Sequence, residues 1–371
     1  MNVPLLDLVA QYRAIKDEVL PALEAVIESQ QFIMGPAVPQ LETAVAQLSH
    51  ARHGIGCASG TDALLLPLKA LALRPGDEVI TTPFTFFATA GAIHNAGGTP
   101  VFADIAPDTF NLDPDAVEAA VTARTRAIVP VHLYGQMVAL ERLLAIAARR
   151  GIKLVEDAAQ AIGARRSIDG EWRMAGELGW VTGYSFFPSK NLGAWGDGGM
   201  MVTSDDQLAE RLRRLRLHGG AKQYHHDEVG TNSRLDTVQA AVLLAKLAHL
   251  ADWSARRRQH AAYYSAALAD LPRVRPPVVE SNNEHIFHQY TLRVERRDEL
   301  QAHLRSKGIG SAVYYPIPLH LQACFSHLGY ARGRFPEAER AAGEVLSLPV
   351  YPELRREQLD YVIDAIRGFY R

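Results

Sequence analysis

Residues 54–84 read GIGCASGTDALLLPLKALALRPGDEVITTPF and predict a strand, a helix and a second strand in succession. Residues 54–59 form a short apolar run, 61–73 have helical spacing, and 78–84 form another apolar run. The turn sequence Pro75-Gly76-Asp77 separates the helix from the second strand. Both strands are continuous apolar runs, a pattern typical of a sheet that is covered on both faces. The stretch therefore predicts a β-α-β unit.

The same alternation continues along the chain, which predicts a mainly parallel α/β sheet. Two later β-rich runs lie so close together that no crossover helix fits between them, so we expect at least one of their strands to be antiparallel. The further predicted strands are 99–105, 127–133, 152–158, 180–187 and 198–204, and the predicted helices are 85–95, one that begins at Asp113-Pro114, 138–150 and 205–217.

Two long helical segments frame this region. The first, 11–30, contains Pro21, where we expect a kink. The second begins near Leu235, continues to about residue 268, and has the length typical of a helix that joins a large domain to a small one. The rest of the chain mixes β runs with helices. We therefore predict a large domain over 1–245 and a small α+β domain over 246–371.

Bulk composition excludes several classes of protein. The 371 residues carry a formal net charge of −2, which argues against a general nucleic-acid binder, and the arginine-rich run 211–216 is interpreted as a solvated helix face. Cys57 and Cys324 form neither a disulfide framework nor a zinc pattern. The chain starts without a secretory signal and has no apolar run of about 18 residues. We expect a cytoplasmic protein with no metal and no membrane association.

Two polar motifs follow predicted strands, at the edge where α/β sheets bind ligands. Ser59-Gly60-Thr61-Asp62 combines glycine with a helix N-terminus, which suits a phosphate group, although serine and threonine are also common helix caps. Asp157 ends an apolar strand, and an acid there is costly without a cationic partner. A pyridinium nitrogen would be such a partner. A structural ion pair or a helix cap would explain Asp157 equally well.

Two more motifs complete the set. The run SFFPSK, residues 185–190, puts Lys190 after a strand and before a glycine-rich turn, where a Schiff-base lysine could be desolvated. Ser185 could bind the same phosphate group as Gly60. The run TNSRLD, residues 231–236, offers an amide and a guanidinium group for anions. Taken alone, the first motif is better explained by a surface lysine and the second by a helix cap.

Together, these motifs resemble the DegT–StrS family of pyridoxal-phosphate-dependent nucleotide-sugar aminotransferases. The matching stretches are SGTDAL, EDAAQAIGA, SFFPSKNLGAWGDGGM and VGTNSRLDTVQAA, with PLLDLVAQY and YYPIPLHLQ near the two ends. The resemblance covers essentially the whole chain. It implies fold type I: a mostly parallel seven-stranded sheet between helices, plus a smaller C-terminal α+β domain.

The resemblance also implies a role for each matching residue. Lys190 would bind pyridoxal phosphate as a Schiff base and later move a proton, and Asp157 would pair with the pyridinium nitrogen. Gln160 would contact the phenolic oxygen, and Phe86 would stack on the ring. The phosphate contacts would be Gly60, Thr61, Ser185 and, from the second subunit of a homodimer, Asn232; the substrate contacts would be Arg234, Tyr314, Tyr315 and His320.

The implied reaction moves the amino group of L-glutamate to a nucleotide-linked keto sugar. The NSRLD form favours members that act on 3-keto sugars. Tyr314 departs from the His-Tyr-Pro that several of these members have, so a 4-keto sugar remains an alternative. A decarboxylase or amino-acid transaminase would need an arginine for a carboxylate, for which Arg293 is a candidate. The third alternative is a regulatory protein that binds the cofactor without turnover.

Overall fold

The computed structural model describes residues 1–222 and 224–371 and is built around a central seven-stranded sheet. The strand order is β1-β9-β8-β5-β4-β2-β3. All neighbouring strands are parallel except that β9 runs antiparallel to both β1 and β8. This confirms the predicted mainly parallel sheet and its antiparallel strand. The strands are β1 (His53–Cys57), β2 (Glu78–Thr81), β3 (Thr99–Phe102), β4 (Thr125–Val129), β5 (Lys153–Asp157), β8 (Val181–Ser185) and β9 (Gly199–Thr203).

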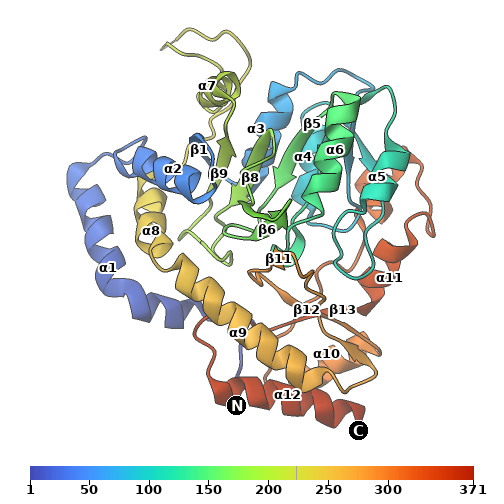
Figure 1. Ribbon diagram of the computed structural model, residues 1–371. Coiled ribbons are helices and arrows are strands. Elements are labelled where there is room, and N and C mark those ends of the chain that lie inside the picture. The colour runs from blue at the N-terminus through green and yellow to red at the C-terminus, as the bar shows by residue number, and fades with distance from the viewer. Residues whose placement is uncertain (223) are drawn as a thin grey trace.

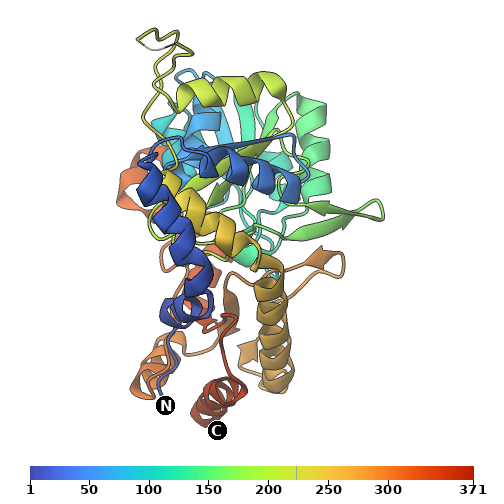
Figure 2. The same ribbon diagram turned by 90° about the vertical axis from the view of Figure 1, so that its left-hand side faces the viewer.

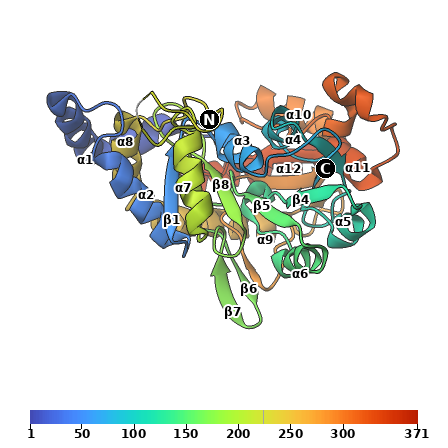
Figure 3. The same ribbon diagram turned by 90° about the horizontal axis from the view of Figure 1, so that it is seen from above.

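Helices cover both faces of this sheet, which explains why its strands are apolar on both sides (Figures 1 and 3). One buried cluster contains side chains of α2 (Ala37–Leu48), α5 (Pro114–Ala120), α6 (Leu140–Arg150) and α8 (Thr237–Leu247). A second cluster, on the other face, contains side chains of α3 (Gly60–Ala70), α4 (Phe87–Asn95) and α7 (Asp206–Leu215).

The C-terminal part has a sheet and a core of its own, below the central sheet in Figure 1. Its three strands have the order β10-β12-β13. Val3, near the N-terminus, is buried in this core and forms a bridge with Ile309. The elements are α9 (Leu250–Leu268), β10 (Val274–Arg275), β12 (Tyr290–Val294), α10 (Arg297–Ser306), α11 (Pro336–Glu344), β13 (Val345–Leu348) and α12 (Arg356–Tyr370). The division of the chain at residue 245 stays a prediction.

Two local features differ from the expectations. The helix expected from Leu235 to about residue 268 is two helices, α8 and α9, with a turn at residues 248–249 that no glycine or proline marks. Helix α1 (Leu8–Ser29) contains Pro21, and the kink expected there stays a prediction. The hairpin of β6 (Arg165–Ile168) and β7 (Glu171–Met174), which pairs with β11 (Asn283–Glu284), was not predicted (Figure 2). Within the described residues, no helix is long and apolar enough to cross a membrane.

Candidate active site

A cavity of about 440 Å³ opens at the carboxyl ends of the parallel strands. Its wall comes from the segments that follow β1, β2, β4, β5 and β8, and from residues 288–289 and 314–315 of the C-terminal half. Such a strand edge is where α/β sheets bind ligands. We call it the cofactor cavity. Nine of the predicted site residues line it: Gly60, Thr61, Phe86, Asp157, Gln160, Ser185, Lys190, Tyr314 and Tyr315.

Asp157 is the last residue of β5 and lies at the floor of the cofactor cavity, with 5% of its surface exposed. Its Oδ2 accepts a hydrogen bond from Thr89 Oγ1 at 2.8 Å, and its Oδ1 accepts one from the Ala159 backbone N–H at 3.1 Å. Burial raises the pKa of this carboxyl group, and the two hydrogen bonds and Lys190 oppose that rise. A cation bound beside Asp157 would therefore stabilise its charged form.

Lys190 lies in the turn between β8 and β9, where its backbone N–H donates to the Phe187 carbonyl oxygen at 2.8 Å. Lys190 is partly buried, and desolvation of the amine lowers the pKa of Lys190 to about 8, while the nearby Asp157 carboxyl opposes this fall. An amine with that pKa is partly neutral near neutral pH, and only the neutral form attacks a carbonyl group. Lys190 and Asp157 thus provide the amine and the acid that pyridoxal phosphate requires.

Beside Asp157 and Lys190, the site contains a third part at the N-terminus of α3. We call it the phosphate cradle, and it consists of residues 59–61 and Ser185. Ser59 caps the helix by accepting the Asp62 backbone N–H at 3.1 Å. A Cβ added to Gly60 would lie 2.5 Å from Ser185 Cβ, closer than real side chains approach, so the position requires glycine. The free N–H groups and positive dipole of a helix N-terminus suit an anion. The cradle therefore fits the phosphate of pyridoxal phosphate.

Two aromatic side chains, Phe86 and Tyr315, form part of the cavity wall. The ring of Phe86 is 58% exposed and lies 6.3 Å from the ring of Tyr315. Gln160 holds this wall, because its Oε1 accepts the Tyr134 backbone N–H at 2.7 Å and its Nε2 donates to Tyr315 Oη at 3.0 Å. One N–H of the Gln160 amide remains for the predicted contact with the phenolic oxygen of the cofactor.

Several lining residues were missed by the sequence analysis, among them His288, Gln289, Ser189 and Asp197. His288 is buried, and its ring Nδ1 lies 3.2 Å from Oδ1 of Asn191, the residue after Lys190. Burial lowers the pKa of His288 well below its usual value, so the imidazole is neutral. No local pattern marks it, because nearly a hundred residues separate it from Lys190 in the chain.

Three predicted residues lie outside the wall of this cavity. Asn232 is exposed, and Arg234 lines a different hollow of about 1000 Å³. His320 is buried among aromatic side chains, with its Nε2 3.0 Å from Glu339 Oε1 and its ring edge against Phe335. The geometry of one chain therefore does not support His320 as a substrate contact, and that role stays a prediction.

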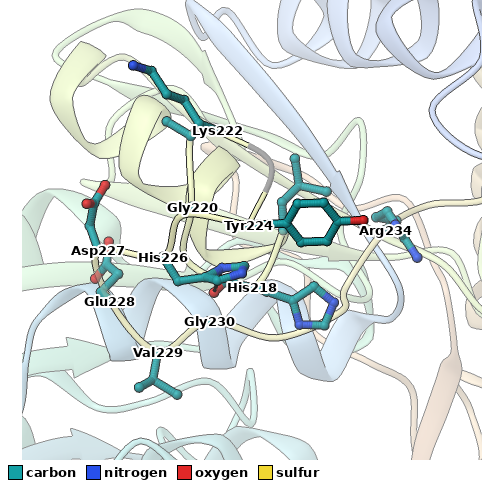
Figure 4. A pocket seen from close by; sticks show the side chains of 12 residues that line it. His218, Gly220, Lys222, Tyr224, His226, Asp227, Glu228, Val229, Gly230 and Arg234 are labelled. Carbon is teal, nitrogen blue, oxygen red and sulfur yellow. Dashed lines mark hydrogen bonds between the residues drawn. The ribbon is translucent and has the colours of Figure 1, made fainter.

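The larger hollow lies beside residues 217–234, which we call the projecting loop. It extends past α7, away from the C-terminal half of the molecule (Figures 1 and 2). Its two stems pair with each other, because Leu217 bridges Asn232 and the His218 N–H donates to the Thr231 carbonyl oxygen at 3.0 Å. Figure 4 shows His218, Tyr224 and Arg234 among the side chains around the hollow.

Comparisons with known proteins agree with this geometry. Residues 13–367 match the model of the DegT/DnrJ/EryC1/StrS aminotransferase family. A protein of Geobacillus stearothermophilus named pleiotropic regulatory protein is 54% identical, over 100% of this chain and 99% of that protein. The UDP-N-acetyl-3-dehydro-alpha-D-glucosamine 3-aminotransferase of Acidithiobacillus ferrooxidans is 46% identical, over 98% and 97%. The solved structure of S. venezuelae DesV with a ketimine intermediate has a TM-score of 0.96 and 44% identity, and covers 100% and 99%.

Proposed function

Since this chain belongs to the DegT/DnrJ/EryC1/StrS aminotransferase family, we propose that it moves the amino group of L-glutamate to carbon 3 of a nucleotide-linked keto sugar. The chain is a pyridoxal-phosphate-dependent aminotransferase of fold type I. The observation that carries the proposal is the convergence of Lys190, Asp157 and the phosphate cradle on one cavity. The 3-keto assignment is supported by the names of relatives that share 42–46% of their residues with it.

Four residues of the cofactor cavity, Lys190, Asp157, Gly60 and Ser185, have a defined part in the proposed reaction. When bound, the cofactor carries the amino group and stores the electron pair that is released at carbon. The Nζ amine of Lys190 takes up and releases the proton, for which a pKa of about 8 is well suited. Asp157 holds a proton on the ring nitrogen, and Thr89 and Ala159 orient its two oxygens. Gly60 and Ser185 hold the phosphate.

The remaining polar groups of the wall are suited to a sugar. His288, Gln289, Tyr314 and Tyr315 line the cavity without a place in the cofactor assignments above. Burial keeps His288 neutral and raises the pKa values of both tyrosines, so these side chains offer uncharged donors and acceptors. Uncharged groups of this kind hydrogen-bond sugar hydroxyls without introducing a buried charge.

The charges of the cavity support a homodimer with shared sites. Among the described residues, Lys190 is the only cation that lines the cofactor cavity, whereas Asp157 and Asp197 are two acids, and Arg293 is not part of the wall. Arg293 instead pairs with Glu344 at 2.8 Å and lies over the Phe110 ring. Glutamate and a nucleotide diphosphate are anionic, so they need further cations.

A second copy of the chain would supply these cations through its projecting loop. Lys222 and Arg234 line the hollow of this loop and do not reach the cofactor cavity of their own chain. An apolar surface of α1 and the segment after it is also exposed, including Val9, Ile27 and Ile33, and Tyr12 packs edge-on against Trp195 in the turn after Lys190. A patch of this kind is typical of a protein interface.

The substrate proposal is tested with purified enzyme, L-glutamate and a panel of UDP- and dTDP-linked sugars with the keto group at carbon 3 or carbon 4. We expect 2-oxoglutarate to form with the 3-keto sugars. Turnover confined to 4-keto sugars would overturn the carbon position but not the reaction class. Borohydride treatment should fix the cofactor on the peptide that contains Lys190, and a label on the peptide of Lys246, another buried lysine, would overturn the assignment.

The shared site is tested by mixing two inactive variants, Lys190→Ala and Asn232→Ala, under conditions that exchange subunits. With random exchange, about half of the dimers are mixed, and each mixed dimer has one site free of both changes. About a quarter of all sites should therefore regain activity. If Asn232→Ala alone is inactive, exchange is demonstrated, and no activity returns, Asn232 acts within its own chain.

One observation favours a regulatory role as the second candidate: the 54% identical relative is named a regulatory protein. The chain nevertheless has the full set of cavity residues described above, which a protein without turnover would not need. The two candidates separate in the assay with the sugar panel. Cofactor bound at Lys190 without turnover of any sugar, together with salt-dependent DNA retention, would favour regulation.

A further inference from the structure

Ser233 lies where the projecting loop returns to the body of the protein, between the exposed Asn232 and helix α8. Its side chain is fully buried, with 0% of its surface exposed. The hydroxyl donates to Asp62 Oδ2 at 2.6 Å and accepts the Ala58 backbone N–H at 3.2 Å. Both partners flank the phosphate cradle, because residues 58–62 connect β1 to the first turn of α3. A residue of the loop is therefore bonded directly to the two residues that flank the cradle of its own chain.

The outgoing stem of the loop is anchored on the same segment. The Ser233 N–H donates to the Arg216 carbonyl oxygen at 3.0 Å. The guanidinium group of Arg216 is buried, donates to the Gly56 carbonyl oxygen at 2.8 Å, and pairs with Glu42. Arg216, just before the first stem, and Ser233 in the second are thus bonded to β1 and to the residues that flank the cradle. The rest of the loop extends into solvent (Figure 1). A displacement of the cradle would therefore also displace the loop.

We propose that Ser233 is a positioning residue for two cofactor sites at once. Its hydroxyl holds Asp62 beside the cradle of its own chain, and its backbone position directs the adjacent Asn232 toward the cofactor phosphate of the second subunit. This inference rests on the shared site of the proposed function. Binding free energies are coupled reciprocally, so an occupied cradle in one subunit also favours the loop position that completes the other site.

Loss of the Ser233 hydroxyl acts on the two sites by different routes. In its own chain, Asp62 loses its donor, so the first turn of α3, which borders the cradle, is held less firmly. The half-buried Ala58 N–H also loses its acceptor. At the cofactor site of the second subunit, the contact comes from Asn232 of the variant chain, and the loop that carries this residue is held by one hydrogen bond fewer. A hydrogen bond to a charged group is strong enough that we expect cofactor affinity to fall on the order of tenfold at each site.

Mixed dimers separate these two routes. One chain keeps Lys190 and the other carries Lys190→Ala, so the visible absorbance of cofactor joined to Lys190 reports one defined site. Two different affinity tags isolate the mixed dimers, and a titration with pyridoxal phosphate gives the dissociation constant. In the first arm Ser233→Ala is in the chain that keeps Lys190, and in the second arm it is in the other chain. We expect weaker binding in both arms.

The outcomes discriminate between the models. If cofactor binding weakens in the first arm alone, Ser233 supports only the cradle of its own chain. If it weakens in the second arm alone, Ser233 acts only through the loop. Either result overturns the two-site proposal. The shared site itself fails separately, if the mixture of Lys190→Ala and Asn232→Ala does not regain activity. The control is Ser265→Ala, which removes a hydroxyl that bonds Tyr290 Oη at 3.0 Å in the C-terminal part and should leave both constants unchanged.

A second pair of variants tests the same bond from its other end, without a change to a buried side chain. Asp62 is only partly buried, so Asp62→Ala removes the acceptor without emptying the core. We expect Asp62→Ala to weaken binding in both arms as Ser233→Ala does. Asp62→Asn keeps an acceptor for the Ser233 hydroxyl and should retain affinity within about threefold of the parent. If Asp62→Asn binds as weakly as Asp62→Ala, the charge of Asp62 matters rather than the bond, and the proposal is wrong.

Discussion

The floor of the cofactor cavity and the projecting loop are both rich in polar side chains, yet only at the floor do these side chains find their partners within the same chain. On the floor, Asp157 has a partner for each of its oxygens. On the loop, Tyr224 is 86% exposed and Val229 is 88% exposed, although both are large and largely apolar. The floor is therefore organised before any ligand arrives, whereas the loop has contacts still to make.

This difference has a physical cause. Charged groups in a dry site are costly without partners, so the fold supplies those partners from neighbouring segments. The tip of the loop is held by hydrogen bonds within the loop itself, such as the Asp227 N–H to the Gly219 carbonyl oxygen at 3.0 Å. Changes at the floor should therefore alter chemistry and stability strongly, and changes at the loop tip should alter only contacts with a second copy.

The largest effect is expected for Asp157→Asn. The variant should bind the cofactor but fail to keep a proton on the ring nitrogen, and the loss of this ion pair in a dry site should reduce kcat/KM roughly a hundredfold or more. The measurement is transamination at saturating cofactor. The control is Asp169→Asn, the same change at an exposed turn residue with positive φ, a conformation that asparagine tolerates. A rate for Asp157→Asn within threefold of the parent would mean that the acid is misassigned.

The second effect concerns the stability of the cofactor-free protein. The pKa of Lys190 falls from 10.5 to about 8 in the folded state, so below pH 8 folding buries a charged amine and stability is reduced. As pH rises from about 8 to 10.5, the unfolded chain binds more protons than the folded one, and stability rises. Lys190→Met should therefore stabilise the free protein by about 2 to 3 kcal/mol at pH 7 and by much less at pH 10.

Urea unfolding at the two pH values measures this change. Lys307→Met serves as the control because Lys307 is exposed, and it should shift stability by no more than about 0.5 kcal/mol at either pH. A gain from Lys190→Met that is equal at pH 7 and pH 10 would show that side-chain packing, and not the buried charge, is responsible.

The same contrast explains which features were predictable from the sequence. The seven central strands were predicted within a few residues because buried strands form continuous apolar runs. Asp157 stood out because a charged residue at the end of such a run is unusual, and Lys190 because it follows a strand and precedes a glycine-rich turn. The break between α8 and α9 was missed because apolar residues continue on both sides of it and no glycine or proline marks it.

Residues that meet only through tertiary packing were also missed. Thr89 reaches Asp157 from a helix that is 68 positions away in sequence, and His288 meets Asn191 from 97 positions away. Neither residue has a neighbour that would single it out. The loop presents the opposite case, because Asn232 and Arg234 belong to a recognisable motif but lie outside the cavity of their own chain. Their predicted role depends on a second copy.

The third prediction sharpens the description of the cradle. Gly60→Ala introduces a Cβ about 2.5 Å from Ser185 Cβ, so the cradle must widen and the cofactor should bind about tenfold more weakly, as measured by titration of the cofactor-free protein. The control is Gly343→Ala in α11, where no atom lies within 4 Å of the added Cβ and alanine favours a helix. Unchanged affinity for Gly60→Ala would mean that the phosphate binds elsewhere.

The smallest effect is expected in the projecting loop. Val229→Ser removes an apolar side chain that its own chain barely covers, so the free energy of unfolding of the separated subunit should change by no more than about 0.5 kcal/mol. The same substitution at Val155, which is fully buried in β5, should cost several kcal/mol and provides the matched contrast. If the loop packs against a second copy, Val229→Ser should weaken dimer association measurably in sedimentation, with little change in the subunit itself. A large loss of stability in the separated subunit would instead mean that Val229 packs against its own chain, and that the loop is as complete as the cavity floor.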